Sequence, residues 1–319
     1  MSDPPTLLLI PGAWHKPTCY DKVTKLLQDQ HQLKCTSICL PSTMGNRDAT
    51  FKDDLDAARE AISNETTHGR NVVVVAHSYG GMVGNSAIKG FTLPRDATAS
   101  QMQPPNTGCV IGLILIASGF TLTGLTFMDP FFGRPPPFWR VNIETGYAEL
   151  TTSPRELFYH DLPVPEAEFW VSQLTTHSLR SLFEGGEYTY AGWKDVPVWY
   201  IGSIEDHGIP VLAQRMMVGM AREMGGIVEH RELQTSHSPF LSQPEATVMI
   251  TLEAIGAFTG KSKGAKSTVT ERGQAVVVPE TTIWQPLTWL RFGLPLGLGR
   301  VVGRCILLFS WGRKLWGLK

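Results

Sequence analysis

A serine at a predicted strand-to-helix turn is the first residue of this chain whose setting points to chemistry. Residues 71–84 read NVVVVAHSYGGMVG, so a run of valines precedes Ser78 and a helix-like run follows it. A strand, a very tight turn and a helix hold a serine hydroxyl up as a nucleophile. Such a turn needs small neighbours. Gly80 satisfies this, whereas Ala76 stands where glycine is usual and adds a methyl group. Isolated Ser-x-Gly strings are mostly ordinary turns, but this context favours a functional serine.

A serine hydroxyl is a poor nucleophile near neutral pH, so it needs a base, and the base needs an orienting acid. With a serine on such a turn, the acid and then the histidine follow it along the chain. Of nine histidines, His230 and His237 come late enough. His230 lies inside a predicted strand and is interpreted as a packed residue. His237 lies just beyond that strand and is the predicted base. His77, beside the serine, is expected to point away beneath the loop.

The acid should come from a loop that follows a strand at the carboxyl end of the sheet. The apolar run Val196–Ile201 predicts such a strand, and the next residues read GSIEDHGIP. This loop offers two carboxylates, Glu205 and Asp206. Glu205 is more typical of a solvated loop charge, and His207 is expected to be exposed and uninvolved.

Two backbone N–H groups would be needed to stabilise a developing oxyanion. One is expected from Tyr79, at the start of the helix, where the helix dipole also helps. The other should come from the loop after the first strand, which reads PGAWH at residues 11–15. Gly12 permits a close approach of backbone there. His15 fits either a structural role or contact with a substrate.

Apolar runs alternate with helix-like segments through most of the first 260 residues. Strands are predicted at residues 6–10, 34–40, 72–77, 110–117, 196–201 and 227–233, and helices at 20–27, 51–62, 211–223 and 244–258. The strands are apolar on both faces, which is typical of a parallel sheet covered by helices on each side. Between Phe91 and Gly108 the composition predicts a surface connection.

Four segments together resemble the α/β-hydrolase superfamily: PGAWH, the Ser78 turn, EDHGIP at 205–210 and SHSPFLSQPE at 236–245. The likeness covers about residues 5–260 and is closest to plant-type methyl esterases and hydroxynitrile lyases and to fungal hydrolases of natural-product pathways. It implies an α/β-hydrolase fold, with a mostly parallel sheet, helices on both faces and a helical cap insertion. It also implies Asp206 as the acid, by its place before x-x-Ile-Pro, and Ala13 as the second oxyanion donor.

The resemblance implies a serine hydrolase that cleaves an ester, lactone or thioester of a small to medium apolar substrate, with secondary metabolism as one setting. No cofactor and no metal are implied. The lyase relatives carry threonine at the position of Gly12 and lysine after the catalytic histidine. Gly12 and Ser238 therefore argue against cyanohydrin cleavage. Two alternatives stay open: cyclisation or acyl release in polyketide-type biosynthesis, and a non-catalytic ligand-binding protein of this fold.

The resemblance also organises the chain into a core at residues 1–120 and 195–260, a cap at 121–194 and an extension at 261–319. The cap is rich in proline and aromatic residues. Most of these aromatics are expected to form its own core, and Trp139 and Trp170 are weak candidates for substrate contact. The GKSKGAK segment that opens the extension is predicted to be a flexible basic linker.

The composition describes an ordinary globular protein, with 42% hydrophobic and 18% charged residues. A net charge of −1 argues against a general attraction to nucleic acid. The five cysteines form no CxxC pair, which indicates reduced thiols in an intracellular, cytoplasmic protein. The MSDPPT start predicts no signal peptide. The oligomeric state is not predicted.

The last forty residues have their own pattern. No acidic residue follows Glu280, and the basic residues Arg291, Arg300, Arg304, Arg313, Lys314 and Lys319 alternate with four tryptophans and many leucines. No uncharged apolar stretch reaches the length needed to span a bilayer, because Arg300 and Arg304 interrupt the most apolar part. Basic residues with tryptophan predict peripheral membrane contact through residues 281–319. The alternatives are a disordered extension and a segment that docks on the core or on a second subunit.

Overall fold

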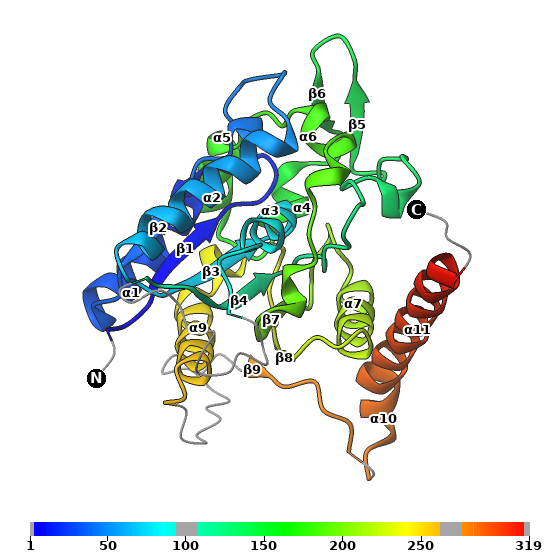
Figure 1. The fold of residues 1–319 in the computed structure, drawn as a ribbon. Coiled ribbons are helices and arrows are strands. Elements are labelled where there is room, and N and C mark those ends of the chain that lie inside the picture. The colour runs from blue at the N-terminus through cyan, green and yellow to red at the C-terminus, as the bar shows by residue number, and fades with distance from the viewer. Residues whose placement is uncertain (1–2, 94–106, 262–275, 283, 316–319) are drawn as a thin grey trace.

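The computed structural model describes residues 3–93, 107–261, 276–282 and 284–315. Its centre is a seven-stranded sheet in the order β2-β1-β3-β4-β7-β8-β9 (Figure 1). The strands are β1 Thr6–Ile10, β2 Cys35–Ser37, β3 Val72–His77, β4 Val110–Ile116, β7 Val198–Ser203, β8 Val228–Leu233 and β9 Val276–Val277. All pairs are parallel except β8 with β9. The predicted mostly parallel sheet is confirmed.

The register of the strands places four loops along one edge of the sheet. Ile10 pairs with Ala76, His77 with Ile116, and Ile116 with Ile201. These pairs lie at the carboxyl ends of β1, β3, β4 and β7, so the segments that follow these strands leave the sheet side by side. Ligand sites of open parallel sheets form at this edge.

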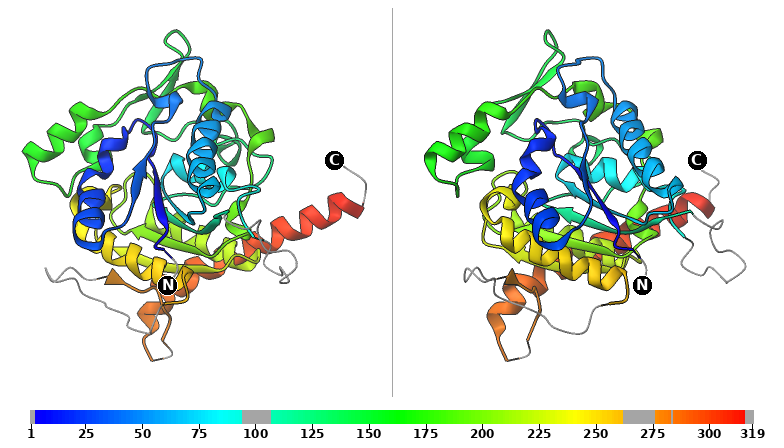
Figure 2. Two further views of the ribbon diagram at one scale, coloured as in Figure 1. Left: turned by 60° about the vertical axis from the view of Figure 1, so that its left-hand side comes forward. Right: turned by 90° about the vertical axis from the view of Figure 1, so that its left-hand side faces the viewer.

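Helices cover both faces of the sheet, as predicted (Figure 2). In the core they are α1 Asp21–His31, α2 Phe51–Thr67, α3 Tyr79–Ala87, α7 Val211–Glu223, α8 Pro239–Ser242 and α9 Pro244–Phe258. On β4, Gly112 packs against the ring of Phe258 in α9, whereas Leu115, which has the opposite side-chain direction, faces α3. Tyr200 pairs with Leu115 and hydrogen-bonds Gln214 of α7, so α3 and α7 share a face.

Between β4 and β7 the chain forms a separate group of small elements, which lies above the carboxyl edge of the sheet in Figure 1. They are the hairpin β5 Trp139–Asn142 and β6 Tyr147–Leu150, and the helices α4 Pro154–Phe158, α5 Val164–Gln173 and α6 Leu179–Phe183. The hairpin was not predicted. Helix α5 ends at Gln173, because the N–H and the hydroxyl of Thr175 both bond to the carbonyl of Trp14.

After the strand β9, the described part of the C-terminal extension is helical from Pro286 onward. After α10, Pro286–Thr288, a π-helical turn over Trp289–Gly293 leads into α11, Leu294–Leu315, which packs along α7 (Figure 1). This corresponds to the predicted docking alternative. By length and composition alone, Pro286–Gly312 could cross a membrane if the arginines within it are tolerated. Most of the predicted basic linker, and of the connection between Phe91 and Gly108, lies outside the described residues.

Candidate active site

The turn between β3 and α3 is as tight as the sequence predicts. Ser78 has a φ of 50°, a conformation that non-glycine residues rarely adopt. A Cβ atom at Gly80 would lie 2.3 Å from the carbonyl oxygen of Pro11, so only glycine fits there. The extra methyl group of Ala76 is accommodated because it faces Gly84. A Cβ atom at Gly84 would lie only 3.1 Å from the Cβ atom of Ala76. The alanine at the first position of the motif is therefore compensated by Gly84, which lies one helical turn after Gly80.

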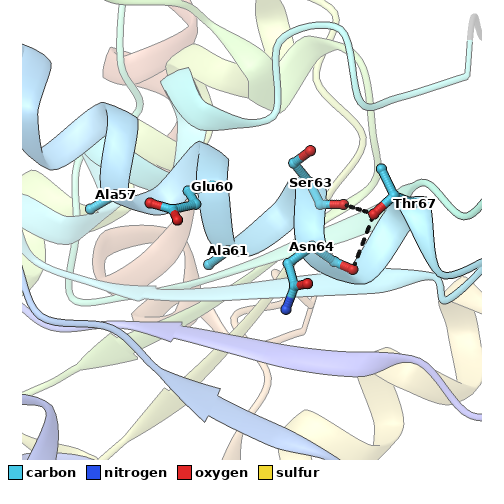
Figure 3. A pocket seen from close by; sticks show the side chains of 6 residues that line it. All are labelled: Ala57, Glu60, Ala61, Ser63, Asn64 and Thr67. Carbon is cyan, nitrogen blue, oxygen red and sulfur yellow. Dashed lines mark hydrogen bonds between the residues drawn. The ribbon is translucent and has the colours of Figure 1, made fainter.

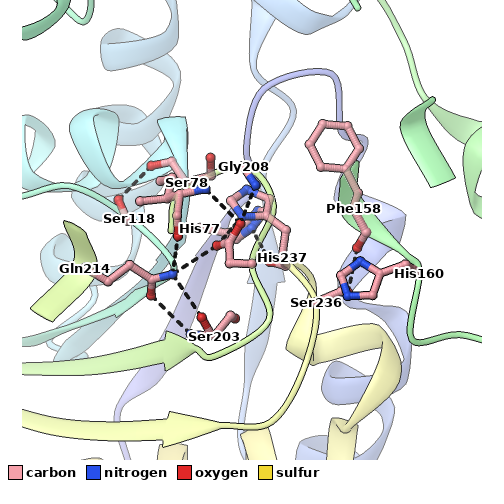
Figure 4. A network of polar contacts seen from close by, with 12 residues as sticks. His77, Ser78, Ser118, Phe158, His160, Ser203, Gly208, Gln214, Ser236 and His237 are labelled. Atoms are coloured by element: carbon pink, nitrogen blue, oxygen red, sulfur yellow. Dashed lines mark hydrogen bonds and ion pairs between the residues drawn. The ribbon is translucent and has the colours of Figure 1, made fainter. Parts of the chain in front are cut away.

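The structure brings together the predicted base and acid. His237 Nδ1 lies 2.7 Å from Asp206 Oδ2, and both side chains are buried. The other carboxylate oxygen accepts bonds from the N–H groups of Gly208 and Ile209, and Gln214 Nε2 bonds Oδ2 (Figure 4). These donors fix the orientation of the carboxylate. An ionised Asp206 holds the proton of His237 on Nδ1, so Nε2 is left as the basic nitrogen.

Glu205 is placed differently from its neighbour. Its side chain is exposed and bonds the amide of Gln234, away from His237. His207 is exposed, as predicted, but it bonds the carbonyl of Glu156 and stacks on His160, with ring centroids 4.1 Å apart. Of the two carboxylates in this loop, only Asp206 contacts the histidine.

Ser78 lies at the same edge of the sheet as His237, on the neighbouring loop in Figure 4. Within the described residues, the Ser78 hydroxyl and His237 Nε2 make no hydrogen bond to each other. Catalytic hydrogen bonds of this kind commonly tighten only when substrate binds. The Ser78 carbonyl is held by the hydroxyl of Ser118 at 2.7 Å.

His77 does not point away from the site, in contrast to the sequence prediction. Its Nε2 lies 3.0 Å from the carbonyl oxygen of His237, and the two rings are 4.5 Å apart. A carbonyl only accepts, so Nε2 carries the proton, and burial lowers the pKa of His77 well below its usual range. A neutral His77 therefore holds the backbone of the His237 loop. Its Nδ1 packs against Gly12, where a Cβ atom would lie only 2.7 Å away.

The loop after β1 is fixed by the elements above the sheet. Trp14 has a φ of 61°, and its indole N–H donates to the carbonyl of Ala148 in β6. Thr175 bonds the carbonyl of Trp14, as described above. This strained residue belongs to the same loop as Gly12, where a Cβ atom would lie 3.1 Å from the Cβ atom of Ser78, so contacts that are distant in sequence hold this loop beside the Ser78 turn.

Tyr79, which follows Ser78, is anchored through its side chain. The buried phenol donates to Asp54 Oδ2 at 2.7 Å, and Ser42 gives the same carboxyl two further hydrogen bonds. Burial raises the pKa of Asp54 to about 6, against the opposing effect of these bonds. Asp54 was not predicted from the sequence, because its position in a helix with an ordinary capping box carries no signal for this contact.

A second missed residue, Asp161, joins the α4–α5 connection to the His237 loop. Its Oδ2 accepts bonds from the hydroxyl of Thr235 at 2.7 Å and from the N–H of Ser236 at 2.9 Å. The hydroxyl of Ser236 donates to the carbonyl of Phe158, whose ring lies 5.6 Å from that of His237. The predicted base is therefore positioned by the segment 158–161, which also places an aromatic ring over it.

The weak candidates for substrate contact separate into two groups. His15 and Trp170 line a small cavity of about 10 Å³ with Lys16, Thr18, Cys19, Tyr159, Gln173 and Leu174. Trp139 instead packs on Trp14 and Phe183, as part of a buried aromatic cluster. A larger depression of about 520 Å³ lies along the outside of α2 (Figure 3). All six of its lining residues belong to that one helix, so it is not an enclosed site.

His15 is fully enclosed, and this predicts a dependence of stability on pH. Its Nδ1 lies 2.7 Å from the Ala13 carbonyl and its Nε2 2.8 Å from the Tyr159 hydroxyl. Burial lowers the pKa of His15 to about 4. The unfolded chain therefore binds a proton at higher pH than the folded one, and stability is lost as pH falls from 6.5 to 4.

We expect this histidine to account for about 3 kcal/mol of the fall in unfolding free energy over that range. Urea unfolding of the wild type and of His15→Gln at several pH values would measure it. The variant should show a shallower loss of stability with acid, whatever its stability at neutral pH. Equal slopes in the two proteins would contradict the prediction.

Comparisons with a family model and with known proteins agree on one family. A model of the alpha/beta hydrolase family matches residues 7–250. The alpha/beta hydrolase nvfD of Aspergillus novofumigatus is 25% identical over 255 residues, which cover 79% of this chain and 97% of that protein. A pyrethroid hydrolase of Sphingobium wenxiniae is 24% identical over 286 residues, covering 84% of this chain and 92% of that one.

Solved structures share the fold. A pyrethroid hydrolase from Sphingobium faniae superposes with a TM-score of 0.60 at 21% identity, over 79% of this chain and 98% of that one. Tomato methylketone synthase I gives the same TM-score at 13% identity, over 81% of this chain and all of that one. The family match spans most of the sequence, and it includes the Ser78 turn and the loops of Asp206 and His237. The chain therefore belongs to the alpha/beta hydrolase family.

Proposed function

We propose that this protein is a serine hydrolase that cleaves carboxylic esters, lactones or thioesters of small to medium apolar substrates. The observation that carries the proposal is the buried His237–Asp206 pair, 2.7 Å apart, beside a serine on a strained turn. The pyrethroid hydrolases among the relatives support hydrolysis as the reaction class. The aromatic ring of Phe158 beside His237 supports an apolar substrate.

In the proposed reaction, His237 Nε2 takes the proton of Ser78 as Oγ bonds to the carbonyl carbon. Asp206 stabilises the resulting imidazolium without taking its proton. The tetrahedral intermediate collapses, the alkoxide or thiolate leaves with the proton from His237, and an acyl-enzyme remains. Water then gives a proton to His237 as it attacks the acyl carbon, and His237 passes that proton to Ser78 Oγ as the bond from Oγ to the acyl carbon breaks and the acid is released.

The oxyanion is assigned to the backbone N–H groups of Ala13 and Tyr79. Tyr79 is the first residue of α3, where N–H groups lack partners within the helix and the dipole favours negative charge. The bond from its phenol to Asp54 and the anchoring of Trp14 hold these two donors in place before substrate arrives. Such preorganisation is what makes an oxyanion hole effective.

Active-site labelling tests the proposal. A fluorophosphonate probe should label the wild type and not Ser78→Ala, and short p-nitrophenyl esters should be turned over by the wild type only. Ser78-dependent labelling without hydrolysis of an ester panel would contradict hydrolysis and favour acyl transfer or cyclisation. Absence of labelling in a folded wild-type protein would favour a ligand-binding protein and overturn the proposal.

A prediction about Gly80 tests the geometry of the oxyanion donors. Alanine there would place its Cβ 2.3 Å from the carbonyl oxygen of Pro11, which belongs to the loop carrying Ala13. That loop must move away from α3, and the two N–H groups separate. We expect kcat to fall by about 10²–10³-fold, the usual loss of an oxyanion donor. Unfolding free energy should also fall by about 1–3 kcal/mol from overpacking.

The matched control is Gly119→Ala, whose Cβ would meet only Met217 Sδ, at an ordinary 3.7 Å. Ester turnover and urea unfolding would be measured for both variants. Similar kcat values for the two would show that the approach of Gly80 to Pro11 has no part in catalysis.

A further inference from the structure

The C-terminal helical segment has one side against the core and a second, apolar side facing outward. The docked side carries Phe292, Gly299 and Gly303, which are buried. We define the outer face by five residues that recur at helical spacing and are 45–66% exposed: Leu290, Leu294, Leu298, Val301 and Leu308. In the left view of Figure 2, the end of α11 projects beyond the core.

The docking on α7 is built closely enough to fix which side faces outward. A Cβ atom at Gly299 would lie 1.9 Å from the carbonyl oxygen of Met216, and one at Gly219 would lie 2.1 Å from that of Leu296. The two helix backbones therefore touch at glycines on both sides. Rotation of α11 would drive larger side chains into this contact, so the outer face cannot be turned toward the core.

Polar contacts reinforce this orientation. Arg215 of α7 is buried, makes a two-pronged ion pair with Glu232 and donates to the carbonyl of Arg291 at 2.9 Å. Its guanidinium also lies 4.8 Å from the ring centre of Phe292. At the other end, Arg304 bonds Glu223 at 2.6 Å. The segment is therefore held at several points along α7.

The outer face combines features that fit an anionic membrane surface. Exposed apolar patches of this kind mark interaction sites, because leaving them in water is costly. Only 22% of the most apolar 18-residue window of Pro286–Gly312 is buried. The exposed residues Arg291 and Arg300 flank the apolar face, and no acidic residue follows Glu280. Basic residues beside an apolar helical face are typical of helices that lie in the interface of an anionic bilayer.

We propose that residues 284–312 attach the protein to an anionic membrane, with α11 lying in the plane of the interface. The outer face enters the boundary between headgroups and acyl chains, the arginines contact lipid phosphates, and the docked side stays on α7. A spanning orientation would strip α11 from α7 and place Arg300 and Arg304 in hydrocarbon. A second copy of the chain bound at the outer face is disfavoured, because the charges that the two segments would bring together are all positive. The proposal does not depend on the proposed catalytic function.

Vesicle flotation of the full-length protein tests it. Phosphatidylcholine vesicles with one quarter phosphatidylserine should carry the wild type upward, and pure phosphatidylcholine vesicles should carry much less. The triple variant Leu290→Ser, Val301→Ser and Leu308→Ser should bind at least about tenfold more weakly, because apolar insertion is lost. The control Leu125→Ser, Ile143→Ser and Val164→Ser removes apolar residues of comparable exposure, 37–82%, elsewhere. It should bind as the wild type does.

A charge variant separates the electrostatic contribution. Arg300→Gln should reduce partitioning to the anionic vesicles about fivefold, the equivalent of ~1 kcal/mol for one basic residue near the surface. Its partitioning to neutral vesicles should not change.

Three outcomes would overturn the proposal. The first is equal flotation of the two triple variants. The second is wild-type protein that stays with the vesicles in alkaline carbonate, which would indicate a spanning helix. The third is wild-type protein that does not float with vesicles but sediments as a dimer in their absence, with the dimer lost only in the outer-face triple variant. That result would assign the outer face to a second copy of the chain.

Discussion

Replacing Ser78 by alanine is expected to lower kcat/KM for short p-nitrophenyl esters by about 10⁴-fold or more, as the loss of a nucleophile does in other triads. The variant keeps the proposed oxyanion donors, so the remaining rate measures binding and oxyanion stabilisation alone. Folding should survive, because the Ser78 hydroxyl makes no hydrogen bond within the described residues. Alanine should adopt the strained φ of 50° about as readily as serine does.

Ser203 provides the matched control for this experiment. It lies at the end of β7, at the same edge of the sheet, and its hydroxyl is buried without a hydrogen-bond partner among the described residues. Ser203→Ala should therefore keep nearly full activity. Unfolding of both variants would be followed by circular dichroism. If Ser78→Ala retained more than about one per cent of the wild-type rate while folded, Ser78 could not be the nucleophile.

The sequence was most informative where local pattern and fold coincide. The valine run before Ser78 is a strand because it is buried on both faces, and the small residues after it permit the turn. His237, and the loop that carries Glu205 and Asp206, were found by chain order and by the strands β8 and β7 that precede them, whereas the choice of Asp206 came from the family resemblance. Those loops lie together because the carboxyl ends of parallel strands are all at one edge of the sheet. No knowledge of side-chain contacts was needed for this step.

The parts that were missed depend on contacts between distant segments. Asp161 is 74 residues from Thr235, and Asp54 is 25 residues from Tyr79. No spacing rule links such pairs, because a buried carboxyl and an exposed one look the same in a sequence. His77 was misplaced for the same reason, since its direction is set by the carbonyl of His237 on a loop 160 residues away.

The C-terminal segment shows a different limit. Its arginines interrupt the apolar run in the sequence, which argued against a helix of spanning length. In the helix, Arg304 pairs with Glu223 of α7, and Arg300 lies beside the outer face rather than within it. Linear order therefore hid an apolar face that the helical arrangement separates from its charges.

The second large effect is expected at Asp206. Replacing it by asparagine preserves size but removes the charge that stabilises an imidazolium at His237. The Asp206 side chain receives N–H groups from Gly208, Ile209 and Gln214, so an amide NH₂ in its place must face at least one donor. If the amide oxygen takes the place of Oδ1 and accepts from Gly208 and Ile209, the NH₂ group faces His237 Nδ1 and Gln214 Nε2, and it forces the proton of His237 to Nε2. That tautomer cannot accept the proton of Ser78. We expect kcat to fall by about 10³–10⁴-fold.

Glu205→Gln is the matched variant, because it neutralises the neighbouring carboxylate, which contacts Gln234 and not His237. It should change kcat by less than about threefold, since an exposed charge contributes little. Both kcat and KM would be measured from pH 5 to 9. A loss confined to KM in Asp206→Asn would show that Asp206 acts only in binding. A larger loss in Glu205→Gln than in Asp206→Asn would make Glu205 the acid, which would require the loop to rearrange when substrate binds.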